Sequence, residues 1–230
     1  MGVPGTAGPG AWAGAGLFAI SIAGFLFSYA FTFAGQPTAP RPVYDTAVNL
    51  LLFLGFATHH SLFARTRIRG WVARTVPAVS ERTLFVCVAS VLLLLVCRLW
   101  RLLPGTVWHV EGAAAALLHA TQIAGIFLVV RSAAVVGVRD LAGLSSSHAS
   151  SEVKIRGPYR WIRHPIYAGW LLLTFAVPLM SMTRFVFAVA SAAYLLIAMP
   201  WEERTLRRLT PQGYARYSAQ VKWRLLPGVY

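Results

Sequence analysis

The sequence has few charged residues and very few acidic ones. Asp, Glu, Lys and Arg make up 12% of its 230 residues, whereas hydrophobic residues make up 57%. A soluble domain usually carries about twice that charged fraction. The scarcity of charge, together with a mean hydropathy of +0.61, argues against a soluble domain and predicts an integral membrane protein.

The acidic residues are also too few to balance the basic ones. Seven Asp and Glu stand against 21 Lys and Arg, which gives a formal net charge of +14. In a soluble protein this excess would suggest nucleic-acid binding, but here the arginines cluster in the loops between apolar runs. Membrane topology and anionic lipids account for such a distribution, so we expect membrane lipids and no nucleic acid as partners.

Cysteine is scarce, and the two present cannot pair with each other. Cys87 and Cys97 lie ten residues apart in one apolar run, which is about 15 Å along a helix and too far for a disulfide. His59 and His60 are adjacent and have no carboxylate or cysteine near them in sequence, so no metal site is expected. The chain also lacks a Walker-type phosphate loop, HExxH, GxSxG and a dinucleotide fingerprint, which argues against the enzyme classes that use them.

Six apolar runs dominate the chain. They are Ala11–Ala34, Ala47–Phe63, Thr83–Leu103, Gly112–Val138, Ile166–Met182 and Phe185–Trp201. Three of them reach the roughly 20 residues that span the hydrocarbon core, and only Thr183-Arg184 separates the last two, which predicts a tight helical hairpin. Backbone in lipid must satisfy its own hydrogen bonds. We therefore predict an all-α fold, a polytopic transmembrane helical bundle of about five to six membrane helices, with a C-terminal helical hairpin and an interfacial tail helix.

The basic loops predict the orientation of this bundle. Residues 65–82 carry five arginines and one glutamate, and further basic residues follow the fourth and the sixth runs. If the runs alternate across the membrane, all three basic segments fall on one side, and the positive-inside rule makes that side cytoplasmic. We expect both termini in the cytoplasm. The Ala-, Arg- and Gly-rich composition suggests a bacterial inner membrane.

The densest polar segment is RGPYRWIRHPIYAGW, Arg156–Trp170. A Gly-Pro pair marks a turn, and Pro165 suits the first turn of a helix, which places His164 at that helix's N-terminus. With Arg163 beside it, this is a ready anion site, and the aromatic rings could stack a planar group or surround a cation. The alternative is an interfacial anchor made of an aromatic belt and snorkelling arginines.

Two adjacent glutamates, Glu202 and Glu203, directly follow the last apolar run. On a helix they point about 100° apart, so they cannot form a catalytic dyad on one face. They could partner the arginine cluster or a cationic ligand, or form a local ion pair with Arg207. The tail after them, Gly213–Pro227, is typical of an interfacial amphipathic helix with two tyrosines on one face, and it could also cover a site.

These pieces occur in a recognisable order: GPYRWIRHPIYAG, a short hairpin, EE, then a tyrosine-rich tail that ends WRLLP. The order resembles the integral-membrane methyltransferases of the isoprenylcysteine carboxyl methyltransferase and phospholipid methyltransferase superfamily. Upstream, HSLFAR, RTVPAVSERT and DLAGL look like the methanethiol S-methyltransferase branch of that superfamily. With these pieces the resemblance covers most of Ala47–Pro227.

The resemblance implies a binding site for S-adenosyl-L-methionine, the methyl donor, on the cytoplasmic side. The residues that match the family's Arg-His-Pro element, its glutamate pair and its tyrosines are expected to bind this cofactor. They are Tyr159, Arg163, His164, Pro165, Tyr167, Gly169, Glu202, Glu203, Tyr214 and Tyr217. We expect residues 1–230 to form a single membrane-embedded domain. Four membrane helices would lie in residues 11–138, and the cofactor-binding loop, the hairpin and the tail in residues 139–230.

The branch resemblance favours a small thiol as the methyl acceptor. After DLAGL, however, the loop SSSHASS departs from that branch. The alternatives are therefore carboxyl methylation of an isoprenylcysteine-like substrate and N-methylation of a lipid amine. A thiol must react as its thiolate, so Arg65, Arg74 and Arg156 are candidates to orient the acceptor. The non-enzymatic alternatives are a membrane sensor or assembly protein on a degenerate methyltransferase scaffold, and a small transporter. The sequence leaves the oligomeric state open.

Overall fold

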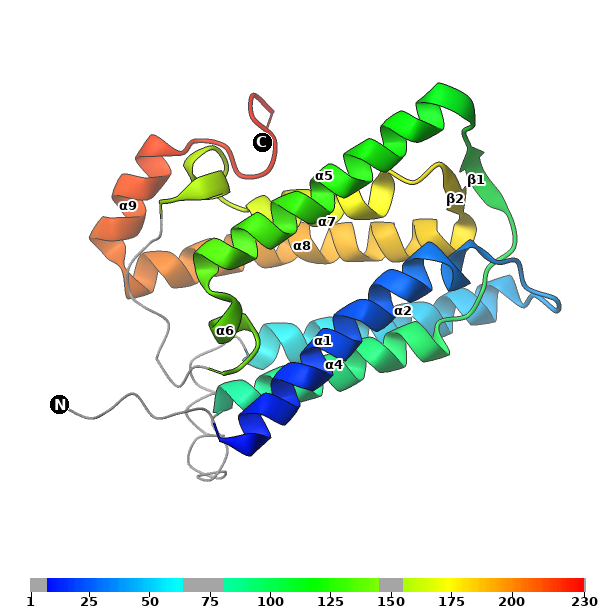
Figure 1. Cartoon of the computed structure of the whole chain (residues 1–230), viewed down its shortest axis with the longest axis horizontal. Coiled ribbons are helices and arrows are strands. Elements are labelled where there is room, and N and C mark those ends of the chain that lie inside the picture. Colours follow the sequence, from blue (N-terminus) through cyan, green and yellow to red (C-terminus); the bar gives the residue numbers. More distant parts are fainter. Residues whose placement is uncertain (1–7, 64–80, 145–154, 230) are drawn as a thin grey trace. The chain divides into compact units, whose positions relative to one another are not determined.

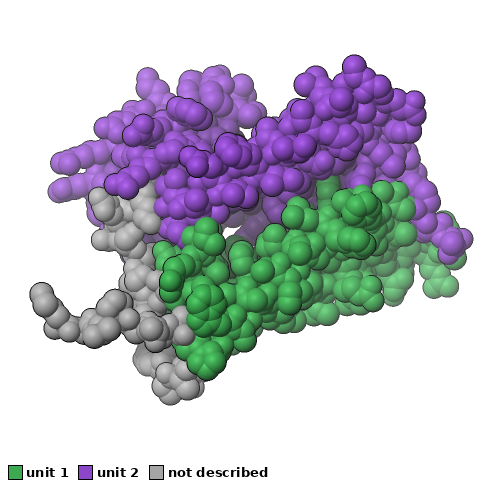
Figure 2. All heavy atoms as spheres, viewed as in Figure 1, with its two compact units in different colours: residues 1–35, 39–102, 138–148 green, residues 36–38, 103–137, 149–230 purple. Residues whose placement is uncertain are grey.

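A computed structural model describes residues 8–63, 81–144 and 155–229 of the chain. Helices make up nearly all of its regular structure (Figure 1), which confirms the expected all-α fold. The chain divides into two compact units (Figure 2). Unit 1 combines residues 1–35, 39–102 and 138–148, and unit 2 combines residues 36–38, 103–137 and 149–230. The organisation as one membrane-embedded domain stays a prediction.

The helices follow the predicted apolar runs. Four of the described helices are long and apolar enough to cross a membrane. They are α1 (Pro9–Ala30) with the 3-10 turn η1 (Thr32–Ala34), α4 (Glu81–Leu99), α5 (Gly112–Val136) and α8 (Met182–Leu209). The second run forms α2 (Pro42–Phe63), and the fifth forms the shorter apolar helix α7 (Pro165–Phe175).

Unit 1 is built around α4, which packs against both α1 and α2 and is followed later in the chain by the short helix α6 (Val138–Leu141). Its core is aromatic: the Phe33 ring lies 6.1 Å from that of Tyr29 and 5.9 Å from that of Trp100. The fully buried Asn49 side chain on α2 bonds both the backbone N–H and the carbonyl of Arg101, at 2.8 and 2.9 Å. Asn49 thereby fixes the backbone just after α4.

Unit 2 is held together by an unusually close contact between α5 and α7. A Cβ atom on Gly125 would lie 2.7 Å from the Gly169 carbonyl oxygen, and one on Gly169 would lie 2.6 Å from the Gly125 carbonyl oxygen. The two backbones can approach this closely only because both residues lack a side chain, as in the small-residue interfaces of other membrane helices.

The turn between α7 and α8 differs from the prediction. The sequence suggested that Thr183-Arg184 separates the two helices, whereas α7 ends at Phe175 and α8 already begins at Met182. The turn contains the strand β2 (Leu179–Ser181), which pairs antiparallel with β1 (Thr106–His109). The Ser181 hydroxyl accepts a hydrogen bond from the backbone N–H of Arg184 and so caps α8.

The C-terminal part extends one predicted helix and shortens another. Helix α8 continues past Pro200 and the end of the sixth apolar run to Leu209, and the two glutamates lie on this continuation. The predicted tail helix is only half right, because α9 covers Pro211–Gln220 and the chain then becomes extended at Val221. Just beyond it, the carbonyls of Trp223 and Arg224 accept hydrogen bonds from the residues that precede α7.

Candidate functional site

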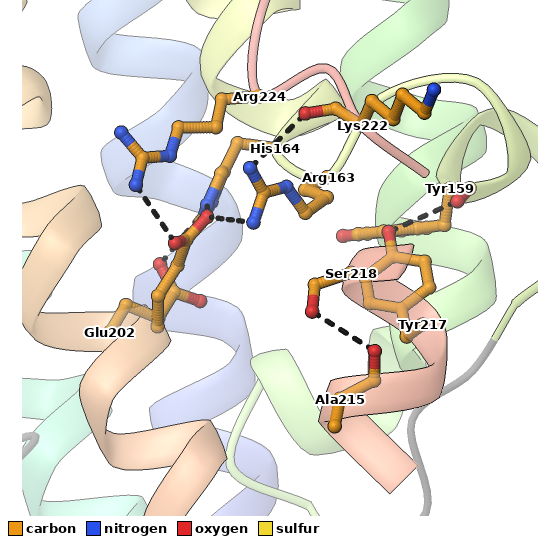
Figure 3. A network of polar contacts seen from close by, with 10 residues as sticks. Tyr159, Arg163, His164, Glu202, Ala215, Tyr217, Ser218, Lys222 and Arg224 are labelled. Atoms are coloured by element: carbon orange, nitrogen blue, oxygen red, sulfur yellow. Dashed lines mark hydrogen bonds and ion pairs between the residues drawn. The ribbon is translucent and has the colours of Figure 1, made fainter. Parts of the chain in front are cut away.

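Three segments of unit 2 meet around one carboxylate (Figure 3). The first is the pair Arg163-His164, which directly precedes α7. The second is the charged part of α8, which carries Glu202 and Glu203. The third is the non-helical segment Val221–Leu226, which we call the strap.

Glu203 is the centre of this arrangement. Its side chain is 3% exposed, and both of its oxygens are occupied. Oε1 lies 3.1 Å from the Arg163 guanidinium and 3.2 Å from His164 Nε2, while Oε2 lies 3.3 Å from the Arg224 guanidinium. A buried carboxylate requires such compensation, because an unpaired charge would be very costly at this depth. Two permanent cations therefore face one buried anion.

His164 lies between the two glutamates. Its Nδ1 is 3.7 Å from Glu202 Oε2, on the side opposite the Nε2 contact with Glu203. The Tyr167 ring stacks on the imidazole with centroids 5.2 Å apart, and its hydroxyl donates a 2.7 Å hydrogen bond to Glu202. The glutamates thus diverge on the helix as expected, but one imidazole connects them. The geometry does not favour the alternative, a local ion pair of a glutamate with Arg207. The Arg207 guanidinium instead lies over the Tyr214 ring.

The strap brings in Arg224, a residue that the sequence did not assign to the site. The backbone N–H groups of Arg163 and His164 donate to the carbonyls of Trp223 and Arg224, both at 2.9 Å. The Arg163 guanidinium also donates to the Lys222 carbonyl at 3.2 Å. The only local signal was the WRLLP ending, which the resemblance matched as a segment without giving any of its residues a role.

The tyrosines of α9 form the next layer. Tyr217 donates a 3.0 Å hydrogen bond to the Tyr159 carbonyl, which joins α9 to the 3-10 turn η2 (Gly157–Arg160). Burial raises the pKa of Tyr214 to about 12, and the nearby Glu203 carboxylate adds to the rise. The Tyr214 hydroxyl is therefore neutral at physiological pH. It lies near Glu203 and Arg163, yet no hydrogen bond to a described residue meets the geometric requirements.

The other predicted residues have diverse positions. Pro165 occupies the first turn of α7, as predicted, and is buried. Gly169 lies in the contact with α5 described above, which explains a glycine there without a ligand. Arg156 is exposed at the start of η2. Arg65 and Arg74 lie outside the described residues.

The arrangement suits a ligand that carries both an anionic and a cationic or hydroxylated part. The two positive charges of Arg163 and Arg224 exceed the single negative charge of Glu203. The N-terminus of α7 adds partial positive charge. Glu202, with 48% of its side chain exposed, offers a carboxylate beside them. For Arg163 Nε and the Tyr214 hydroxyl, both buried at this site, no hydrogen bond to a described residue is found. Buried polar atoms without a partner are rare in folded proteins and often belong to binding sites.

Comparison with known proteins identifies the family. A family model described as phospholipid methyltransferase matches residues 111–211. The methanethiol S-methyltransferase of Mycobacterium tuberculosis is 33% identical over 219 residues, which cover 87% of this chain and 89% of that protein. The chain belongs to the phospholipid methyltransferase superfamily, in its methanethiol S-methyltransferase branch. It is a membrane methyltransferase.

Two further relatives are informative. Methanethiol S-methyltransferase 2 of Bradyrhizobium diazoefficiens is 34% identical, and the alignment covers 88% of this chain and 85% of that protein. Human Nurim, whose name states no activity, is 28% identical over 71% of this chain and 67% of its own length. No solved structure is significantly similar to the chain. The comparisons thus confirm the resemblance read from the sequence motifs.

Proposed function

We propose that the protein transfers the methyl group of S-adenosyl-L-methionine to a small thiol at the cytoplasmic face of the membrane. The observation that carries this proposal is the buried Glu203 carboxylate held by Arg163, His164 and Arg224. The methanethiol S-methyltransferases to which the chain is similar favour a thiol as the acceptor.

The residues of the site fit this methyl donor. Arg163, Arg224 and the N-terminus of α7 would hold its carboxylate, since guanidinium groups and helix N-termini both favour anions. The half-exposed Glu202 would accept hydrogen bonds from the ribose hydroxyls or face the sulfonium. The Tyr214 hydroxyl and Arg163 Nε, for which no hydrogen bond to a described residue is found, would supply further donors. When bound, S-adenosyl-L-methionine supplies a methyl group that is already activated by the positive sulfur.

Methyl transfer to a thiolate places few chemical demands on the protein. The thiol first gives its proton to water. The bond from the acceptor sulfur to the methyl carbon then forms as the bond from that carbon to the donor sulfur breaks. The protein has to orient the two partners and exclude water. Nearby cations would lower the pKa of the thiol. Arg156 remains a candidate for this task, together with Arg65 and Arg74.

The cytoplasmic location rests on the charge around the site. Exposed basic residues surround the last turns of α8, the tail and the strap. They are Arg204, Arg207, Arg208, Arg216 and Lys222. An excess of Lys and Arg beside membrane helices marks the cytoplasmic side.

Calorimetric titration with S-adenosylmethionine and S-adenosylhomocysteine tests the donor. Micromolar binding of either by folded, detergent-purified protein supports the proposal. Binding of neither would overturn S-adenosyl-L-methionine as the methyl donor. Methylation assays with methanethiol, a prenylcysteine and a phospholipid amine then test the acceptor. Turnover of the amine or the prenylcysteine without any thiol methylation would overturn the choice of a thiol.

A further inference from the structure

A surface groove lies on the outer side of the strap. Its volume is about 420 Å³, and it lies between η2 with the following Trp161 on one side and the strap on the other. The groove does not belong to the Glu203 cluster, because none of the residues lining it contributes a side chain to that cluster. We call it the strap groove.

The strap groove is positively charged. Arg160 approaches from η2 and Lys222 from the strap, and both residues are exposed. Of the described residues that line it, none is acidic. A guanidinium offers paired donors and an ammonium a compact charge, and this combination suits a phosphate group.

Two tryptophans also line the groove. Trp161 is 71% exposed and Trp223 is 38% exposed. Exposed indoles are costly on a surface that faces only water, but on a membrane protein they lie at the level of the lipid headgroups. Both segments belong to the same end of unit 2 as the charged last turns of α8 (Figure 1). The groove therefore combines phosphate-binding cations with residues that favour the membrane interface.

We propose that the strap groove binds the phosphate of an anionic phospholipid, with Arg160 and Lys222 as its ligands and Trp161 and Trp223 against the glycerol and upper acyl region. Its volume suits a headgroup and falls in the range of small-molecule sites. This lipid site goes beyond the proposed transferase function and does not require it. A free phosphate ion would also bind the two cations, but it would gain nothing from apolar contact with the two indole rings.

The experiment measures lipid retention by the purified full-length protein. Native mass spectrometry compares phosphatidylglycerol with phosphatidylcholine on the wild type and on the double variant Arg160→Gln/Lys222→Gln. The matched control is Arg208→Gln/Arg216→Gln, which removes the same charge from exposed positions outside the groove. We expect the groove variant to lose at least about fivefold in phosphatidylglycerol affinity and the control to change by less than about twofold. Circular dichroism establishes that all three proteins are folded.

Two results would overturn the proposal. Equal losses in both double variants, or no loss in either, would mean that the net charge attracts the lipid without a defined site. Displacement of phosphatidylglycerol from the wild type by excess inorganic phosphate would assign the groove to a free anion. Because donor binding is measured separately, failure of the lipid site leaves the transferase proposal untouched.

Discussion

His164 Nε2 lies 3.2 Å from Glu203 Oε1, between a residue at the start of one helix and a residue near the end of another. The contact joins α7 to α8 at their charged end, beside the hydrogen bond from Tyr167 to Glu202. The same Oε1 atom also forms an ion pair with the Arg163 guanidinium, so the histidine and the arginine share one acceptor. Any change at Glu203 therefore acts on several groups at once.

Glu203→Gln should weaken the binding of S-adenosyl-L-methionine by at least about tenfold while the protein stays folded. The amide removes the charge that holds Arg163 and Arg224 but keeps some hydrogen bonding, so the geometry loosens without leaving a cavity. His164→Ala should act in the same direction. Calorimetry measures the affinity, and thermal unfolding in detergent monitors the fold. Wild-type affinity in both variants would remove this cluster from the donor site.

Arg224→Gln tests the residue that only the structure revealed. We expect donor affinity to fall by about three- to thirtyfold, because one of the two guanidiniums at Glu203 is lost. The control is Arg216→Gln on the exposed face of α9, which removes the same charge from a position outside the site. If both variants lose affinity equally, the effect comes from the overall charge and not from the strap.

Tyr167→Phe isolates the hydrogen bond to Glu202. The phenyl ring preserves the stack on His164 but removes the 2.7 Å bond, so stability should fall by only about 1 kcal/mol. If Glu202 contacts the donor, we expect donor affinity to fall severalfold. Chemical denaturation and calorimetry give the two values. A large loss of stability with no change in affinity would make this bond purely structural.

Gly169→Ala should destabilise the protein by about 1–3 kcal/mol or more, because its Cβ atom would meet the backbone of α5 at 2.6 Å. Gly125→Ala should behave alike. Gly55→Ala, on α2 with no atom within 4 Å of the added Cβ, should leave stability nearly unchanged or slightly higher. Comparable unfolding temperatures for all three would contradict the close α5–α7 contact.

Cys87→Ala and Cys97→Ala should both retain transferase activity within about twofold. Both thiols lie on α4 in unit 1, and the proposed chemistry requires no protein nucleophile. Turnover with a thiol acceptor measures the effect. Loss of turnover in a folded variant of either cysteine would reveal a role for a protein thiol.

The sequence predicted the helices well because hydrophobic length determines them locally. It also placed His164 at the start of α7, since a proline after it fixes the first turn. The two glutamates and the histidine belonged to one motif set, and the structure brings them together.

What the sequence could not predict depends on contacts between distant segments. The strap has the basic and aromatic composition of an interfacial helix, but its carbonyls accept hydrogen bonds from Arg163 and His164, and it does not form a helix. Each of the strands β1 and β2 depends on the other, and about seventy residues separate them along the chain. The pairing therefore leaves no local signal in the sequence. Gly169 appeared in a cofactor motif, while its contact with Gly125 was invisible without the partner helix.

The strap has a consequence for how the enzyme is made. The carbonyls of Lys222 and Trp223 bond to Arg163, which lies about sixty residues earlier in the chain. The ribosome therefore synthesises α7 and α8 before it adds the strap that bonds to their charged end. During this interval Arg163, His164 and Glu203 lack Arg224 and the strap carbonyls. Completion of the site thus requires the strap to fold back onto residues that were synthesised earlier.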